Sequence, residues 1–182
     1  MRKYLRTAAV LAASAVFTPA VARAQTTVAL PNSTQTTTLT ANVSDQARVT
    51  VPAGVTFAVT NVSANTAASD ASVTIDAIVL AAATNQLKIS LQANAASFTP
   101  PVAGATTWAA GDVTWNAATW TNATGASGTL DSSAYNEVAT CTADASSCTT
   151  NGLVFTLGAK ATVKRAGNHT LQVRWKFEAI GS

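Results

Sequence analysis

Charged residues are scarce in this sequence of 182 residues, at 10% against roughly 25% in an average soluble domain. It holds one histidine and two cysteines, and it lacks a G-x-S-x-G elbow, an H-E-x-x-H helix and a Gly-rich phosphate loop. Its carboxylates are scattered singly, without a D-x-D-x-D-G calcium loop. We therefore expect a protein that is not an enzyme and that has no catalytic site, metal or cofactor. Carboxylates that converge only in three dimensions would leave an enzyme as another hypothesis.

The first 24 residues have the pattern of a signal peptide. Arg2, Lys3 and Arg6 form a positive leader, an apolar run follows over residues 8–17, and Ala22-Arg23-Ala24 fits the cleavage rule. After Ala24, no stretch reaches the roughly 18 consecutive apolar residues of a membrane helix. The pattern predicts export, to a periplasmic, cell-surface or extracellular location, with no membrane span after cleavage.

Removal of the leader changes the charge balance. Four of the eleven Lys and Arg residues lie in residues 1–24, so seven remain against eight carboxylates, a net charge of −1. A nucleic-acid partner needs clustered basic residues on one face, which this balance does not favour. We expect no nucleic-acid partner.

Cys141 and Cys148 enclose six residues. Disulfides persist in exported proteins, so we expect these two cysteines to bond to each other. Closing so short a loop removes only about 2 to 3 kcal/mol of chain entropy. The bridge is expected to shape a local hairpin or loop rather than to hold the fold together.

Apolar and polar residues alternate with period two along residues 25–182, and helical periodicity is absent. Predicted strands include residues 55–59, 73–79, 87–91 and 153–157, and turn signals such as Asn151-Gly152 separate them. The pattern predicts an all-β, antiparallel immunoglobulin-like sandwich of about eight to ten short strands, formed by residues 44–182 as one domain. Residues 93–134 are the least regular part and are expected to form long loops and short hairpins.

The last strand has the strongest contrast between its two faces. Polar and charged residues alternate with four apolar residues that we expect to pack on the core: Leu171, Val173, Trp175 and Phe177. His169 precedes this strand, and without a catalytic partner we expect it to serve in a turn or at the strand edge.

Three tryptophans lie in the irregular 93–134 segment. Trp115 belongs to an alternating run and is expected to face the core. Trp108 and Trp120 pack in the core by one hypothesis. By the other they are displayed and stack on sugar rings, which would make the protein a secreted carbohydrate-binding module.

Residues 25–43 are extended, rich in threonine and uncharged. Such an arm forms either the first strand of its own domain or pairs with the edge of a neighbouring subunit, a recognition mode that relies on backbone hydrogen bonds and alternate side chains. The expected self-association residues are one alternating set and a second donor segment: Leu39, Ala41 and Val43, and Val28 and Leu30.

Four segments together resemble bacterial exported immunoglobulin-like proteins of the pilin and spore-coat-U type: residues 40–44, 48–51, 55–59 and 166–177. His169 stands where that group usually has tyrosine. The resemblance implies a sandwich whose subunits join by donating an N-terminal strand. We therefore expect a structural or adhesive cell-surface protein, with a pilus-like filament subunit as one form of this role. Its expected partners are copies of itself or other surface proteins.

Overall fold

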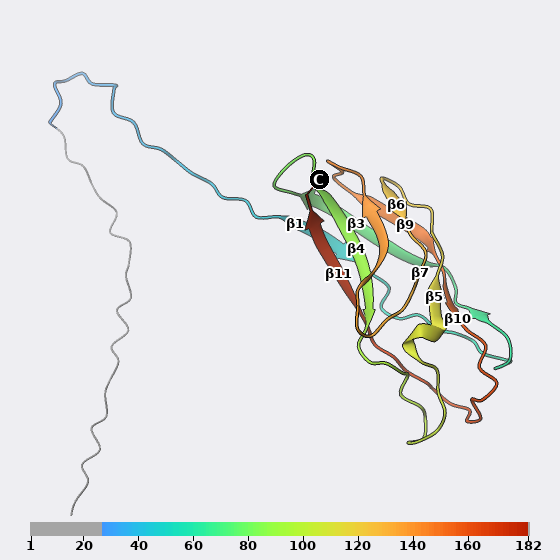
Figure 1. Ribbon diagram of the computed structural model, residues 1–182. Coiled ribbons are helices and arrows are strands. Elements are labelled where there is room, and N and C mark those ends of the chain that lie inside the picture. Colours follow the sequence, from blue (N-terminus) through green and yellow to red (C-terminus); the bar gives the residue numbers. More distant parts are fainter. Residues whose placement is uncertain (1–26, 182) are drawn as a thin grey trace, which may run out of the picture. The chain divides into compact units, whose positions relative to one another are not determined.

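The structure is a computed structural model that describes residues 27–181 (Figure 1). The predicted signal peptide lies outside the described residues. The chain divides into two units, an N-terminal one that ends at Ala41 and a folded body that begins at Asn42. From Thr27 to Ala41 the chain contains no strand or helix and its side chains are almost all exposed.

The body is all-β. One short 3-10 helix accompanies eleven strands: β1 (Gln46–Thr50), β2 (Thr66–Ala67), β3 (Ala71–Val79), β4 (Gln86–Ala93), η1 (Ala110–Asp112), β5 (Val113–Trp115), β6 (Ala123–Gly125), β7 (Gly128–Thr129), β8 (Asn136–Cys141), β9 (Cys148–Leu153), β10 (Phe155–Leu157) and β11 (Val173–Ile180). Every strand pair is antiparallel. The predicted antiparallel β-sandwich is confirmed.

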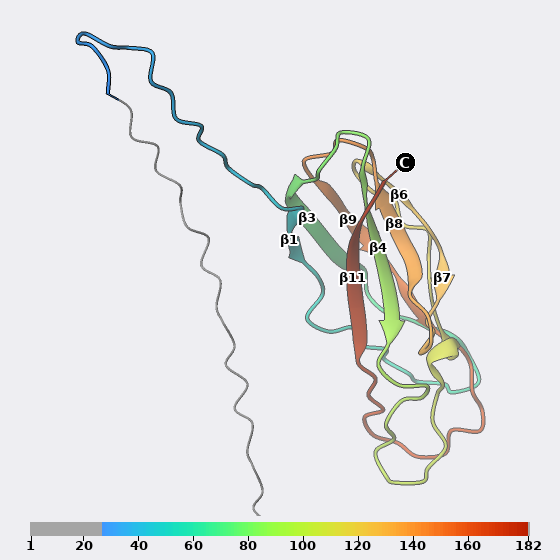
Figure 2. The ribbon, with the colours of Figure 1, turned by 60° about the vertical axis from the view of Figure 1, so that its left-hand side comes forward.

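The strands form two layers. One layer contains the sheet β1-β3-β9 and the sheet β2-β10-β5-β7, which are continuous because only Val154 separates β9 from β10. The other layer is the sheet β11-β4-β8-β6, and Figure 2 shows β11 and β4 in front of β3 and β9. Alternate residues of facing strands, such as Val73 and Ile75 of β3 and Ile89 of β4, are fully buried between the layers. Period-two alternation therefore places one face of each strand in a common core.

The two long sides of the sandwich differ. On one side an isolated bridge between Thr121 and Thr149 joins the layers. On the other side, among residues 27–181, β1 pairs only with β3 and β11 pairs only with β4, so each leaves one edge without a strand partner from the described chain. An unpaired edge presents free N–H and C=O groups that accept a further strand.

Side chains along this open side face the core without being covered. Val173 is opposite the buried Ala93 and therefore shares its face, yet 39% of it is exposed, so the prediction that Val173 packs in the core is wrong. Val49 is opposite the fully buried Ile75 and is 41% exposed. The physical reason is that no strand lies between β1 and β11.

The remaining three residues of the predicted core face, Leu171, Trp175 and Phe177, are partly buried against the core. Trp175 and Phe177 stack nearly parallel, with ring centroids 6.3 Å apart. These contacts anchor β11 on the body but leave part of each side chain open to solvent.

Two local predictions are wrong. Residues 55–59 form no strand, because Pro52 cannot donate to a ladder and the chain there passes from β1 in one sheet to β2 in another. Asn151 and Gly152 lie inside β9 rather than in a turn. There the buried Thr150 hydroxyl accepts a hydrogen bond from the Gly152 N–H, which holds the strand.

Candidate functional site

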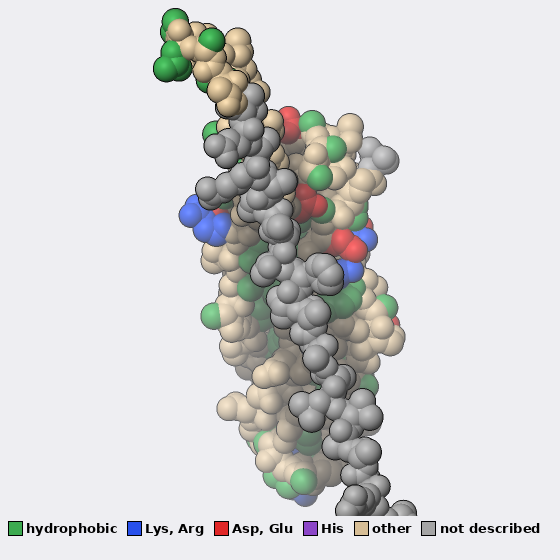
Figure 3. Space-filling view, turned by 90° about the vertical axis from the view of Figure 1, so that its left-hand side faces the viewer, with side chains coloured by type: hydrophobic (Ala, Val, Ile, Leu, Met, Phe, Trp, Pro, Cys, Tyr) green, Lys and Arg blue, Asp and Glu red, His purple; other side chains and the backbone are tan. Residues whose placement is uncertain are grey.

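A groove of about 1400 Å³ opens on the side where β1 and β11 lack strand partners. Its two walls are residues 52–62, which follow β1, and residues 163–175, which lead into β11. On the face that contains this opening, hydrophobic side chains are visible between charged groups at either side (Figure 3). The groove is larger than the roughly 300 to 1,000 Å³ of a small-molecule pocket.

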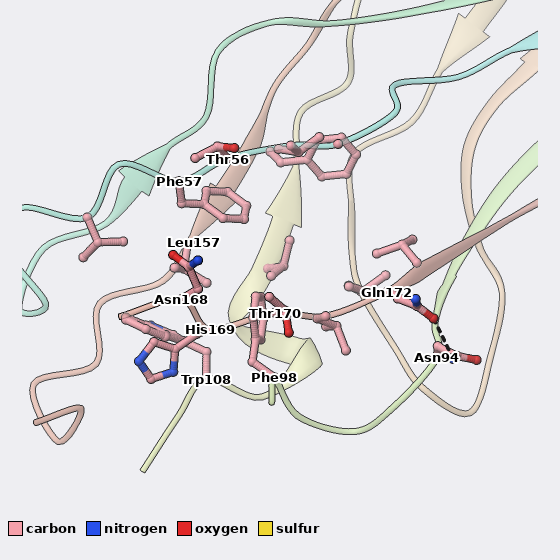
Figure 4. A pocket seen from close by; sticks show the side chains of 18 of the residues that line it. Thr56, Phe57, Asn94, Phe98, Trp108, Leu157, Asn168, His169, Thr170 and Gln172 are labelled. Atoms are coloured by element: carbon pink, nitrogen blue, oxygen red, sulfur yellow. Dashed lines mark hydrogen bonds between the residues drawn. The ribbon is translucent and has the colours of Figure 1, made fainter. Parts of the chain in front are cut away.

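Core side chains form the floor of the groove. Phe57, Phe98, Trp108 and Leu157 surround the same space (Figure 4). All but Phe57 are buried in the body, as are four further lining residues: Leu91, Val113, Leu130 and Phe155. The groove thus reaches the hydrophobic core, and its floor suits apolar side chains rather than a charged ligand.

The wall that leads into β11 is fastened to the loop before η1. His169 Nδ1 lies 2.7 Å from the Thr107 hydroxyl, and Nε2 lies 3.1 Å from the Arg165 carbonyl oxygen. Because a carbonyl only accepts, Nε2 donates to it and, in the neutral ring, Nδ1 accepts from Thr107. The same ring meets Trp108 edge-on, with centroids 5.1 Å apart. His169 thus joins a strand approach to a loop, which agrees with the expected turn or edge role.

Gly167 brings this wall close to the same loop. Its φ angle is +128°, in the region that favours glycine, and an added Cβ would lie 2.8 Å from Pro101 Cβ. Three residues further along, Thr170 forms an antiparallel bridge with Thr99. The groove wall is therefore held against the loop before η1 at several points between Arg165 and the start of β11.

Trp108 and Trp120 do not form a displayed platform. Both are buried, and Trp108 Nε1 donates to the Gly158 carbonyl oxygen at 2.9 Å. The hypothesis that these two rings stack on sugars is wrong, because hydrophobic burial of large aromatic surfaces competes with display. Trp115 is also buried, as predicted. Residues 93–134 contain η1 and the short strands β5 to β7 between long segments without strands, in agreement with the expected loops and short paired strands.

The basic residues of the groove differ from the others in the body. Lys164, Arg165 and Arg174 line the groove, and within residues 27–181 none of them forms a salt bridge. Each of the remaining basic side chains of the described chain has a carboxylate partner: Arg48, Lys88, Lys160 and Lys176. The groove walls therefore carry uncompensated positive charge above an apolar floor.

Four carboxyl groups outside the groove, Asp76, Asp112, Asp131 and Glu178, have lowered pKa values, and Asp112 and Asp76 illustrate the causes. Burial raises the pKa of Asp112, but hydrogen bonds from Lys160 and from the Ala109 N–H outweigh it, so the net shift is downward. A hydrogen bond from the Arg48 guanidinium lowers the pKa of the exposed Asp76. Their hydrogen-bond partners are local, and none of the four lines the groove.

The predicted arm residues are exposed to different degrees. Leu30 is 87%, Leu39 92% and Val43 69% exposed, Ala41 is exposed and Val28 is half-buried. Large apolar side chains left in water are typical of surfaces that bind a partner. Leu39, Ala41 and Val43 alternate in sequence, so an extended backbone places them on one face.

The described chain offers little else that suggests chemistry. Between residues 27 and 181 no three His, Cys, Asp or Glu side chains gather around a point where a metal ion would bind. Over the same residues, no helix has the length and apolar character needed to cross a bilayer.

Cys141 and Cys148 are bonded to each other across the end of β8 and the start of β9, as predicted.

Sequence reasoning identified the arm and the last strand but missed the groove. Its residues Phe57 and Arg165 are more than a hundred positions apart in the chain. In the sequence, Phe57 is marked only by an alternating apolar run and Arg165 only by a basic turn.

No protein family, curated protein or solved structure matches this chain.

Proposed function

We propose that this protein is an exported structural subunit that forms filaments at the cell surface, the N-terminal arm of one copy lying in the groove of another. The observation that supports the proposal most directly is the groove between residues 52–62, which follow β1, and residues 163–175, which lead into the unpaired edge of β11. An extended segment there would hydrogen-bond to the free backbone edge of β11 and pack against the apolar floor, as in strand addition. It would also cover the core-facing Val173, which lines the groove.

The arm has the composition that such a groove requires. Thr37–Val43 is uncharged, contains three threonines and, when extended, presents Leu39, Ala41 and Val43 on one face. Threonine and other β-branched residues favour extended structure. Burial of Leu39 alone would contribute about 1.5 to 3 kcal/mol.

Chain connectivity favours a second copy as the donor. A tight turn at Ser44–Asp45 would pair Val43 with Gln46 and Thr37 with Pro52 within one chain. The copy's own Leu39–Val43 would then lie beside β1, short of the groove wall that begins at Pro52. Residues 28–36, which would reach the wall, include Pro31, and their alternating apolar face is limited to Val28 and Leu30.

Arm and groove are different surfaces, so the contact between copies is heterologous. A heterologous contact that does not close into a ring produces an open filament. The proposal is therefore a filament; reciprocal exchange of arms between two copies would instead close into a two-fold dimer, for which electron microscopy would show no filaments.

The test compares two charge-insertion variants of residues 25–182. Leu39→Asp with Val43→Asp places charge on the apolar face of the arm, and Thr38→Asp with Thr40→Asp places the same charge on its other face. We expect light scattering and electron microscopy to show filaments for the parent and the threonine variant, and monomers for the first variant. Because that variant keeps its groove, adding it to the parent should shorten the filaments.

Monomers in the parent preparation at all concentrations would overturn the proposal. Equal assembly by the parent and the Leu39 and Val43 variant would also overturn it.

A further inference from the structure

The groove carries charge of one sign. Its lining includes three basic residues, Lys164, Arg165 and Arg174, and no Asp or Glu. All three side chains are exposed and, within residues 27–181, form no salt bridge. The arm does not compensate them, because residues 24–44 contain no charged residue. The arm therefore accounts for the apolar floor of the groove but leaves the positive charge of its wall unmatched.

Two of these cations border the apolar floor at one place. Val163 is buried and lines the groove, and Lys164 and Arg165 follow it directly in the chain. The Arg165 carbonyl oxygen accepts a hydrogen bond of 3.1 Å from His169 Nε2, and the His169 ring lies edge-on against the floor residue Trp108. The backbone at Arg165 is thus positioned near the floor before a ligand binds, which lowers the cost of ordering it.

An anion with a long apolar tail matches both features of the groove. We propose that the groove also binds a long-chain fatty acid, with its carboxylate beside Lys164 and Arg165 and its acyl chain along the floor. The floor consists of Phe57, Phe98, Trp108 and Leu157 (Figure 4). A guanidinium donates two parallel hydrogen bonds to a carboxylate and a lysine ammonium adds a point charge, while the acyl chain gains free energy by leaving water.

Other classes of ligand match only one of the two features. A compact anion such as phosphate would bind the cations but leave the apolar floor in water, and a neutral lipid would cover the floor but leave the cations unmatched. An anionic phospholipid in a bilayer has both groups. However, core side chains form the floor between two walls, so an acyl chain reaches it only after leaving the bilayer. A free fatty acid enters singly, which favours it as the occupant.

The fatty acid and the arm compete for one surface. Both place apolar groups against the same floor residues, so binding of one excludes the other. A subunit that holds a fatty acid would therefore not accept an arm until the fatty acid leaves, which makes this ligand an inhibitor of assembly. This consequence rests on the proposed function, whereas the fatty-acid site itself does not.

Tryptophan quenching measures the binding. Trp108 and Trp175 line the groove, and bromine atoms quench the fluorescence of a tryptophan that they contact. The variant Leu39→Asp with Val43→Asp, designed to leave the groove free, is titrated with stearate brominated at mid-chain, below its micelle concentration. We expect saturable quenching, with an affinity about 3- to 10-fold higher than that of the matching brominated alcohol, which lacks the carboxylate. Palmitate should displace the probe at concentrations more than about 100-fold lower than octanoate, since it buries more methylene groups.

Charge variants locate the carboxylate. Lys164→Gln with Arg165→Gln should weaken stearate binding about 3- to 10-fold and leave alcohol binding unchanged. Arg174→Gln is the matched control, because Arg174 lies farther along the same wall, in β11, and it should change stearate binding less than about 2-fold. Circular dichroism verifies the fold of each variant. Equal affinity for acid and alcohol, or equal effects of the two charge variants, would overturn the proposed carboxylate position.

Aromatic variants locate the acyl chain. Phe57 is half-buried in the groove lining, whereas Tyr135 is 40% exposed and does not line the groove. Phe57→Ser should weaken binding of both acid and alcohol by about 3-fold or more, and Tyr135→Ser by less than about 2-fold. Unchanged binding by Phe57→Ser would overturn the proposed site. Quenching by vesicles of brominated phosphatidylglycerol without quenching by free stearate would also overturn it.

These outcomes are separable from failure of the proposed function. If the parent protein forms filaments and stearate does not bind, the filament stands and the fatty-acid site fails. If stearate binds and the parent forms no filaments, the site stands and the filament fails. If both hold, saturating stearate should slow assembly of the parent, and an unchanged rate would overturn the competition.

Discussion

Trp175 lies directly opposite Leu91 across the β11–β4 pair, yet Leu91 is fully buried and Trp175 is only partly buried. Directly paired residues of neighbouring strands share one face of the sheet. The difference in burial therefore reflects position, because β4 is an inner strand and β11 is an edge strand. The core of the body is complete at β4 and open at β11.

This relationship predicts unequal costs of truncation. Leu91→Ala should lower the free energy of unfolding by about 2 to 5 kcal/mol, the range for a buried leucine. Trp175→Ala should cost about 1 to 3 kcal/mol, less than the 3 to 5 kcal/mol of a buried tryptophan. Urea unfolding followed by circular dichroism measures both. A larger loss for Trp175→Ala than for Leu91→Ala would contradict an open core at β11.

The wall of the groove depends on Gly167. Gly167→Ala should destabilise the body by more than about 1 kcal/mol, because alanine disfavours the positive φ and its Cβ would meet Pro101. Gly54→Ala is the matched control, since no atom lies within 4 Å of a Cβ there and the φ angle is not positive. Thermal unfolding of the two variants compares them, and similar midpoints would contradict the tight contact at Gly167.

Stability should fall in acid partly through Asp112. Hydrogen bonds from Lys160 and Ala109 outweigh burial and lower the pKa of this carboxyl in the folded state. A lowered folded pKa contributes stability above the unfolded value of about 3.9, and this stability is lost as pH falls through the folded pKa. Asp112→Asn should therefore lose stability at pH 7 and show a smaller further loss below about pH 4. Parallel urea titrations at both pH values test this, and an identical acid dependence in parent and variant would count against it.

The disulfide should add modest stability. Cys141→Ala with Cys148→Ala should lower the free energy of unfolding by about 2 to 3 kcal/mol from loop entropy, with a further loss because both side chains are buried. Reduction of the parent protein should reproduce the entropic part while the fold persists. Complete unfolding on reduction would show that the bridge holds the body together, contrary to its position in a short loop.

Sequence alone determined the strand-rich fold, because alternating apolar residues give each strand one buried face in any antiparallel arrangement. It identified Trp115 as a core residue and Cys141 and Cys148 as partners, since alternation and close spacing are local properties. It also identified Leu39 and its neighbours as an extended apolar face, whose predicted role in assembly remains to be tested.

Only the tertiary structure decided which faces are covered. The alternation of Val173 is as regular as that of Val73, but Val73 lies on an inner strand and Val173 on an edge, so one is buried and the other is exposed. Trp108 is buried for the converse reason, since Gly158 and His169, which are distant in the sequence, lie against it. The groove forms where residues 52–62 and 163–175 approach, and burial there depends on contacts between parts of the chain that no local pattern specifies.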